Sequence, residues 1–166
     1  MKPEHIDTII FDMDGVIIDS EPIHMKIENQ MFEELNIHIS KEVHQSFVGA
    51  SAKNTFQRLI KDFNLDTTVE QLLYDNESRY LQYLDNHPEI QPIPGVKPLI
   101  ENLVNSGYTL LLASSASIEI IDKVLDIFKF RHFFSHAISG ARLAHSKPHP
   151  EVFFITAEKA RKKPNQ

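Results

Sequence analysis

Residues 11–21, FDMDGVIIDSE, place two carboxylates one residue apart at the point where an apolar run ends. Residues 6–11 have the length and composition of a short buried strand, and Gly15 permits a sharp turn after it. In open parallel sheets the ligand crevice lies outside the carboxyl ends of the strands, so we expect Asp12 and Asp14 to mark the functional site of an α/β fold. Two neighbouring carboxylates can divide two roles between them, an anionic nucleophile or metal ligand and a proton donor.

The stretch from residue 20 to residue 90 has a helical pattern throughout. Apolar residues recur there every three or four positions, which predicts four amphipathic helices. The expected helix starts are Ser20, Ser40, Ser51 and a capping box formed by Thr67 and Glu70. Residues 87–95, HPEIQPIPG, hold three prolines and a glycine, and we expect a stiff connector there.

Beyond residue 95 helices and strands alternate. We expect a helix closed by Gly107, a strand over residues 108–113, a helix starting at Ser117, a strand over residues 136–139 and a last helix near Pro150. Such alternation predicts parallel strands joined by right-handed crossovers. The expected fold class is therefore α/β, with an all-helical insert that splits the core.

Three motifs resemble those of a known family. Residues 11–21 resemble the first motif of the haloacid dehalogenase-like superfamily, and closely that of its subgroup with beta-phosphoglucomutase and the sugar-phosphate phosphatases. Residues 110–117, LLLASSAS, resemble its second motif, a strand that ends in a phosphate-binding Ser or Thr. Residues 146–153, SKPHPEVF, resemble the motif in which a Lys precedes Pro-x-Pro at a helix start. The resemblance implies a Rossmann-like parallel core, residues 1–19 and 92–166, and an inserted helical cap, residues 20–91.

The resemblance also implies a chemistry, the Mg²⁺-dependent hydrolysis of small phosphomonoesters, with sugar phosphates as the expected substrates. Asp12 would attack phosphorus to give an aspartyl phosphate, and Asp14 would protonate the leaving oxygen and later deprotonate water. Asp12 and the backbone carbonyl of Asp14 would be ligands of Mg²⁺. Ser114, the backbone N–H of Ser115 and the ammonium of Lys147 would bind the phosphoryl oxygens, and Lys147 would also offer its charge to Asp12.

The helical insert bears on the choice between phosphatase and mutase. His24 falls where the mutase branch has a histidine that would orient the catalytic acid, although a surface role suits it equally. The loop with Ser51 and Lys53 resembles the substrate-specificity loop of the cap. Ala52 replaces the basic residue of the mutase branch, and Asn76 stands about where that branch has a lysine. We therefore prefer a phosphatase. The alternatives are a beta-phosphoglucomutase-like phosphomutase and a non-catalytic phosphate-binding module.

The resemblance implies one feature that residues 159–166, KARKKPNQ, do not supply. In the family a further strand ends in a pair of acids that complete the Mg²⁺ shell. We interpret the chain as C-terminally truncated and favour a fragment of a longer protein over a natural truncation or completion by another chain through strand exchange. We expect weak Mg²⁺ binding and little or no activity. The sheet edge beside Asp12 would be exposed, so we expect a monomer, with a strand-exchanged dimer as the alternative.

Composition limits the partners and the location. The formal net charge of −6 argues against a nucleic-acid surface, and the lack of cysteine excludes disulfides and thiolate zinc sites. The first apolar run is too short for a signal peptide or a membrane span, so we expect a cytoplasmic protein with no membrane partner. His132 with His136, and His145 with His149, have a spacing that suggests zinc on a helix, but both pairs fall on predicted loop or strand. We interpret them as scattered histidines.

Overall fold

The computed structural model describes residues 6–39, 52–87 and 89–161 of the chain. The helix expected after Ser40 and the cap expected at Ser51 lie outside these residues. The described elements, in chain order, are β1 (Thr8–Phe11), α1 (Glu21–Glu34), α3 (Ala52–Phe63), α4 (Val69–Asn86), α5 (Val96–Asn105), β2 (Thr109–Ser114), α6 (Ile118–Ile127), the 3₁₀ helix η1 (Arg131–Phe133), β3 (Phe134–Ser139) and α7 (Glu151–Lys159).

The chain divides into two compact units. One comprises Met1–Glu21 and His87–Gln166 and is called the α/β unit below; the other, Pro22–Asn86, is called the helical unit. In the part of the chain that the structure describes, no helix is both long enough and apolar enough to cross a lipid bilayer.

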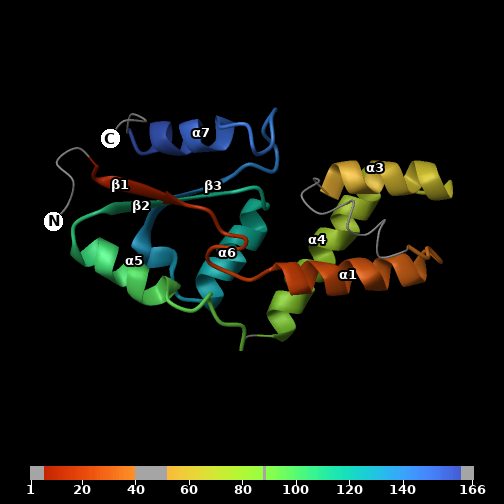
Figure 1. Cartoon of the computed structure of the whole chain (residues 1–166), viewed down its shortest axis with the longest axis horizontal. Coiled ribbons are helices and arrows are strands. Elements are labelled where there is room, and N and C mark those ends of the chain that lie inside the picture. Colours follow the sequence, from red (N-terminus) through yellow and green to blue (C-terminus); the bar gives the residue numbers. More distant parts are fainter. Residues whose placement is uncertain (1–5, 40–51, 88, 162–166) are drawn as a thin grey trace. The chain divides into compact units, whose positions relative to one another are not determined.

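The α/β unit is built on a three-stranded parallel sheet in the order β1-β2-β3. Helix α7 covers one face of this sheet, and α5 and α6 cover the other (Figure 1). Strands with helices on both faces are the arrangement that the alternating sequence pattern predicts, because parallel strands need crossover helices to join them. The predicted α/β fold class is confirmed.

The core of the α/β unit is centred on β2, which pairs with a strand on each side. Leu110, Leu111 and Leu112 of this strand are at most 1% exposed, because helices cover both of its faces. This explains why β2 reads as a continuous apolar run and not as an alternating pattern. The opposing helices contribute the buried residues Ile100, Ile121, Val124 and Val152.

Local signals set most of the element boundaries. The hydroxyl of Ser117 accepts the backbone N–H of Ile120, so the predicted start of α6 is confirmed. Gly107 has φ +79 directly after α5, a left-handed conformation that glycine adopts without steric cost. The capping box predicted for α4 is wrong by one residue. Thr68 caps this helix by accepting the N–H of Gln71 at 3.2 Å.

The helical unit contains α1, α3 and α4. The predicted apolar stripe of α1 is buried at Ile23, Ile27 and Met31, while α4 buries Leu72 in place of the expected Leu73. Tyr80 and Leu84 of α4 are buried as predicted, so the difference is confined to the first turns of this helix.

Two helices of this unit are also joined by charge. Arg79 of α4 donates two hydrogen bonds to Glu34 of α1, at 2.9 and 2.6 Å. These hydrogen bonds lower the pKa of Glu34.

Candidate active site

The carboxyl ends of the three parallel strands meet at one edge of the sheet. Phe11, the last residue of β1, pairs with Leu112, and Ser114, the last residue of β2, pairs with Ser139, the last residue of β3. The register therefore brings Asp12 out of the sheet beside the end of β2. Residues that lie far apart in the chain meet there because parallel strands all end at the same edge.

Lys147 and Asp12 form an ion pair at this edge. The Nζ of Lys147 lies 2.7 Å from Oδ1 of Asp12 and donates to the backbone oxygen of Ala113 at 3.1 Å. The same ammonium lies 5.2 Å from the ring centre of Phe153, close enough for a cation–π interaction. Oδ1 of Asp12 also accepts the N–H of Met13 at 2.7 Å. Within the described residues Oδ2 of Asp12 makes no hydrogen bond, so this oxygen is available to a ligand.

Asp14 is held by the end of β2. The hydroxyl of Ser114, which is fully buried, donates to Oδ2 of Asp14 at 3.3 Å and accepts the N–H of Ala116 at 3.0 Å. Gly15, with φ +71, turns the chain after Asp14, and its N–H donates to the oxygen of Ile18 at 2.8 Å. The tight turn keeps both aspartates at the end of the strand.

The sequence analysis missed two residues that position the loop after β2. The hydroxyl of Ser139 donates to the oxygen of Ala116 at 2.6 Å, and the N–H of Gly140 donates to the oxygen of Ser114 at 2.7 Å. A Cβ on residue 140 would lie 3.2 Å from that same oxygen, so the close approach favours glycine. The sequence feature that could have identified these two residues is a Ser-Gly pair at the end of the strand predicted over residues 136–139.

The structure brings Asp12, Asp14, Ser114 and Lys147 together within the α/β unit. Ser115 is exposed beside Ser114. Two of the predicted residues belong to the helical unit. His24 stacks on Tyr80 there with ring centroids 4.6 Å apart, and Lys53 is exposed at the start of α3. Ser51 lies outside the described residues.

Asn76, where the mutase branch would have a lysine, also lies in the helical unit. Its Nδ2 donates to Sδ of Met31 at 3.7 Å.

The interpretation of all four paired histidines as scattered is wrong for one pair. His145 and His149 lie on the loop before α7, and their rings stack with centroids 4.4 Å apart. A hydrogen bond from the N–H of His149 to the oxygen of Ser146 makes the loop turn. This turn brings two side chains that are four residues apart next to each other, although the loop is not helical. Both histidines also contact Glu151, and hydrogen bonds from the side chain and backbone of His145 lower the pKa of that carboxyl.

The donor atoms at the strand ends suit Mg²⁺. This ion prefers oxygen ligands and keeps several waters, and the carboxylates of Asp12 and Asp14 with the backbone carbonyl of Asp14 are of that kind. Among the residues that the structure describes, these two aspartates do not belong to a larger set of ligands. Across residues 6–39, 52–87 and 89–161, the group of three or more His, Asp or Glu side chains with ligand atoms within 4.8 Å is His145, His149 and Glu151. The strand ends therefore supply two carboxylates for a metal.

Comparisons with known proteins agree with the three motifs. The sequence model of the haloacid dehalogenase-like hydrolases matches residues 9–166. Hexitol phosphatase B of Escherichia coli K12 is 27% identical over 177 aligned residues, which cover 95% of this chain and 71% of that relative. Members of the family generally use Mg²⁺.

Solved structures of the same fold cover most of the chain. CbbY from Rhodobacter sphaeroides in complex with phosphate has a TM-score of 0.80 at 18% identity, with coverage of 96% of this chain and 74% of that one. A beta-phosphoglucomutase from Clostridium difficile has a TM-score of 0.78 at 22% identity, with coverage of 96% and 73%. YfnB from Bacillus subtilis, bound to magnesium, has a TM-score of 0.69 at 18% identity, with coverage of 98% and 77%. At these identities the likeness concerns the fold.

Proposed function

Because this chain belongs to the haloacid dehalogenase-like hydrolase family, we propose that it hydrolyses small phosphomonoesters through an aspartyl phosphate on Asp12, at a low rate because the described residues at this site offer Mg²⁺ few ligands. One observation carries the proposal. The ammonium of Lys147 binds one oxygen of Asp12, while the buried hydroxyl of Ser114 binds Asp14 at the same sheet edge. Sugar phosphates are the proposed substrates, because the relative named hexitol phosphatase B shares 27% of its aligned residues with this chain.

In the first step Asp12 acts as the nucleophile. Its Oδ1 is engaged by Lys147 and Met13, so Oδ2 is the oxygen proposed to form the new bond to phosphorus. The ester bond between phosphorus and the leaving oxygen breaks, and Asp14 gives its proton to that oxygen. The products of this step are the free alcohol and the aspartyl phosphate.

In the second step Asp14, now a carboxylate, removes a proton from a water molecule. The water oxygen bonds to phosphorus, the bond from phosphorus to Oδ2 of Asp12 breaks, and inorganic phosphate leaves. Ser114 positions Asp14 in both steps by donating to its Oδ2. Lys147 offers its charge to the phosphoryl oxygens throughout.

Mg²⁺ would be held by the carboxylate of Asp12 and the backbone carbonyl of Asp14, and when bound it would neutralise charge on the phosphoryl group. One carboxylate and one backbone carbonyl are a small set of protein ligands for this ion. We therefore propose that the described residues bind Mg²⁺ weakly, and isothermal titration that shows tight, single-site binding would contradict this.

Trapping of the covalent intermediate tests the hydrolytic mechanism. Protein is mixed with ³²P-labelled hexitol or hexose phosphate at saturating Mg²⁺, quenched in acid, and assayed for protein-bound label that hydroxylamine releases, as expected of an acyl phosphate. We expect Asp12→Asn to abolish the label. Glu158→Gln, which alters an exposed acid of α7, should retain it. Hydrolysis without trapped label, or label that survives Asp12→Asn, would refute the mechanism.

The same assay separates the two alternatives. Product analysis measures phosphate release and sugar-phosphate isomers together, and isomerisation faster than hydrolysis would favour a phosphomutase. Phosphate binding with neither hydrolysis nor label would favour a non-catalytic binding module.

A further inference from the structure

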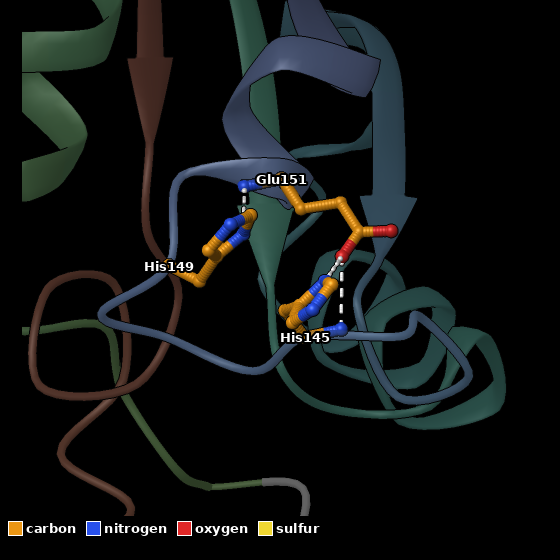
Figure 2. A group of neighbouring side chains, drawn as sticks. All are labelled: His145, His149 and Glu151. Atoms are coloured by element: carbon orange, nitrogen blue, oxygen red, sulfur yellow. Dashed lines mark hydrogen bonds and ion pairs between the residues drawn. The ribbon is translucent and has the colours of Figure 1, made fainter.

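A group of three possible metal ligands lies on the loop that leads into α7. His145 and His149 flank Lys147 in the sequence, and Glu151 is the first residue of the helix. Figure 2 shows both imidazole rings beside the Glu151 side chain, with Glu151 reaching toward His145. Both histidines are exposed, so water and ions can reach the group.

The distances within the group resemble those between ligands of one ion. One ligand atom from each of His145, His149 and Glu151 lies within 4.8 Å of the others. Nδ1 of His145 and Oε2 of Glu151 are 3.0 Å apart. Zinc–nitrogen and zinc–oxygen bonds of about 2.1 Å at a tetrahedral angle put neighbouring ligand atoms about 3.4 Å apart. The pair therefore needs to separate by only a few tenths of an ångström to admit an ion.

Two hydrogen bonds hold the loop around this group. The backbone N–H of His145 donates to Oε2 of Glu151 at 2.8 Å, and the N–H of Glu151 donates to Nδ1 of His149 at 3.3 Å. The first bond holds the carboxylate against the loop and can persist beside a metal, since a carboxylate has lone pairs for both. The second is long, so coordination by His149 loses little by breaking it.

We propose that His145, His149 and Glu151 bind a divalent transition metal of the Zn²⁺ class. Two imidazoles and one carboxylate suit zinc and its neighbours better than Mg²⁺, which prefers oxygen ligands alone. Three protein ligands leave a coordination position for water. This inference is independent of the proposed function, because it uses none of the residues assigned to phosphoryl transfer.

A metal bound by this group would restrain the loop that carries Lys147. His145 and His149 lie on either side of Lys147, whose ammonium binds Asp12 and the oxygen of Ala113. An ion shared by the two histidines and Glu151 ties both sides of Lys147 to the start of α7. Bound metal should therefore restrict the motion of the segment that presents Lys147.

Zinc titration of the tag-free chain tests the site. Zn²⁺ is titrated calorimetrically in millimolar Mg²⁺, and Co²⁺ is used as a spectroscopic probe because four-coordinate Co²⁺ absorbs strongly in the visible range. We expect one equivalent of Zn²⁺ with a micromolar or lower Kd. Substitution of a residue that only hydrogen-bonds to a metal ligand costs roughly 10- to 100-fold in metal affinity. Removal of a ligand itself, by His145→Ala, His149→Ala or Glu151→Gln, should therefore cost at least that much.

Matched controls separate the site from adventitious binding. The double variant His132→Ala with His136→Ala removes an exposed pair of the same spacing and should leave the affinity unchanged. Asp12→Asn should also leave it unchanged, which keeps a failure of the phosphatase proposal distinct from a failure of this one. The proposal would be overturned if the His132→Ala, His136→Ala double variant lost as much Zn²⁺ affinity as the variants of the group, or if the parent chain showed no saturable Zn²⁺ binding. Circular dichroism of each variant confirms that the fold is intact.

Discussion

Replacement of Lys147 by methionine tests whether the positive charge of this residue binds phosphate at the proposed site. The substitution keeps an unbranched side chain of similar length and removes the ammonium, 2.7 Å from Oδ1 of Asp12. A phosphate that binds at this sheet edge would then face the carboxylates of Asp12 and Asp14 without this cation. Loss of the cation should therefore weaken anion binding more than it weakens the fold.

The magnitude follows from the geometry. At 2.7 Å the Coulomb energy of one ion pair is about 6 kcal/mol in an effective dielectric of about 20. The side chains of Lys147 and Asp12 are 24% and 36% exposed, so solvent screening reduces the contribution to stability to about 1 kcal/mol. A hydrogen bond to a charged group is worth about 1.5–3 kcal/mol, which predicts phosphate affinity lower by roughly 10- to 150-fold.

Phosphate affinity is measured by isothermal titration at fixed Mg²⁺ concentration, and stability by urea denaturation. Lys159→Met is the matched control, because it removes the same charge from an exposed position in the last turn of α7. If Lys147→Met and Lys159→Met bind phosphate equally well, the ammonium of Lys147 does not serve the anion and the reasoning fails.

Three further predictions concern stability and pH, all measured by urea denaturation. Ser114→Ala should cost about 1–3 kcal/mol, because the part-buried backbone N–H of Ala116 loses its acceptor and Asp14 loses a donor; a neutral result would contradict the hydrogen bonds. Leu111→Ala, fully buried in the central strand, should cost about 2–5 kcal/mol, and a cost below 1 kcal/mol would contradict its placement. Glu34→Gln should destabilise at neutral pH. Because Arg79 lowers the pKa of Glu34 below its ordinary 4.5, that stabilisation is present above 4.5 and is lost as the pH falls through the folded pKa. The difference in unfolding free energy between Glu34→Gln and the parent chain should vanish in acid. If it persists there, the interaction of Glu34 with Arg79 is not its cause.

Expectations that rested on local signals were the most accurate. A serine before an apolar run predicted the N-cap of α6 at Ser117, since a cap depends only on residues within one turn. The uniformly apolar run before Ser114 predicted a strand buried on both faces. The register of α4 was the exception, because Thr67 and Thr68 carry the same capping group and the sequence alone does not choose between them.

The sequence also predicted that the motifs meet at one edge of the sheet, but it did not predict the hydrogen bonds that position them there. Parallel strands end at one edge of a sheet, so residues after β1 and β2 were expected to meet. The support of the second motif by Ser139 and Gly140 was missed, because it depends on how β3 lies beside β2.

The sequence by itself determined the α/β class, the order of the three motifs and the two carboxylates at the strand end. The fold class and the strand end follow from periodicity, composition and short turn and capping patterns, which act within a few residues, and the motifs follow from their resemblance to a known family. Only the tertiary structure decided that Lys147 also donates to the backbone oxygen of Ala113, and that the side chains of His145, His149 and Glu151 lie together. Both results depend on the path of a loop whose backbone hydrogen bonds follow no repeating pattern, so residue spacing carries no information about which side chains that loop brings together.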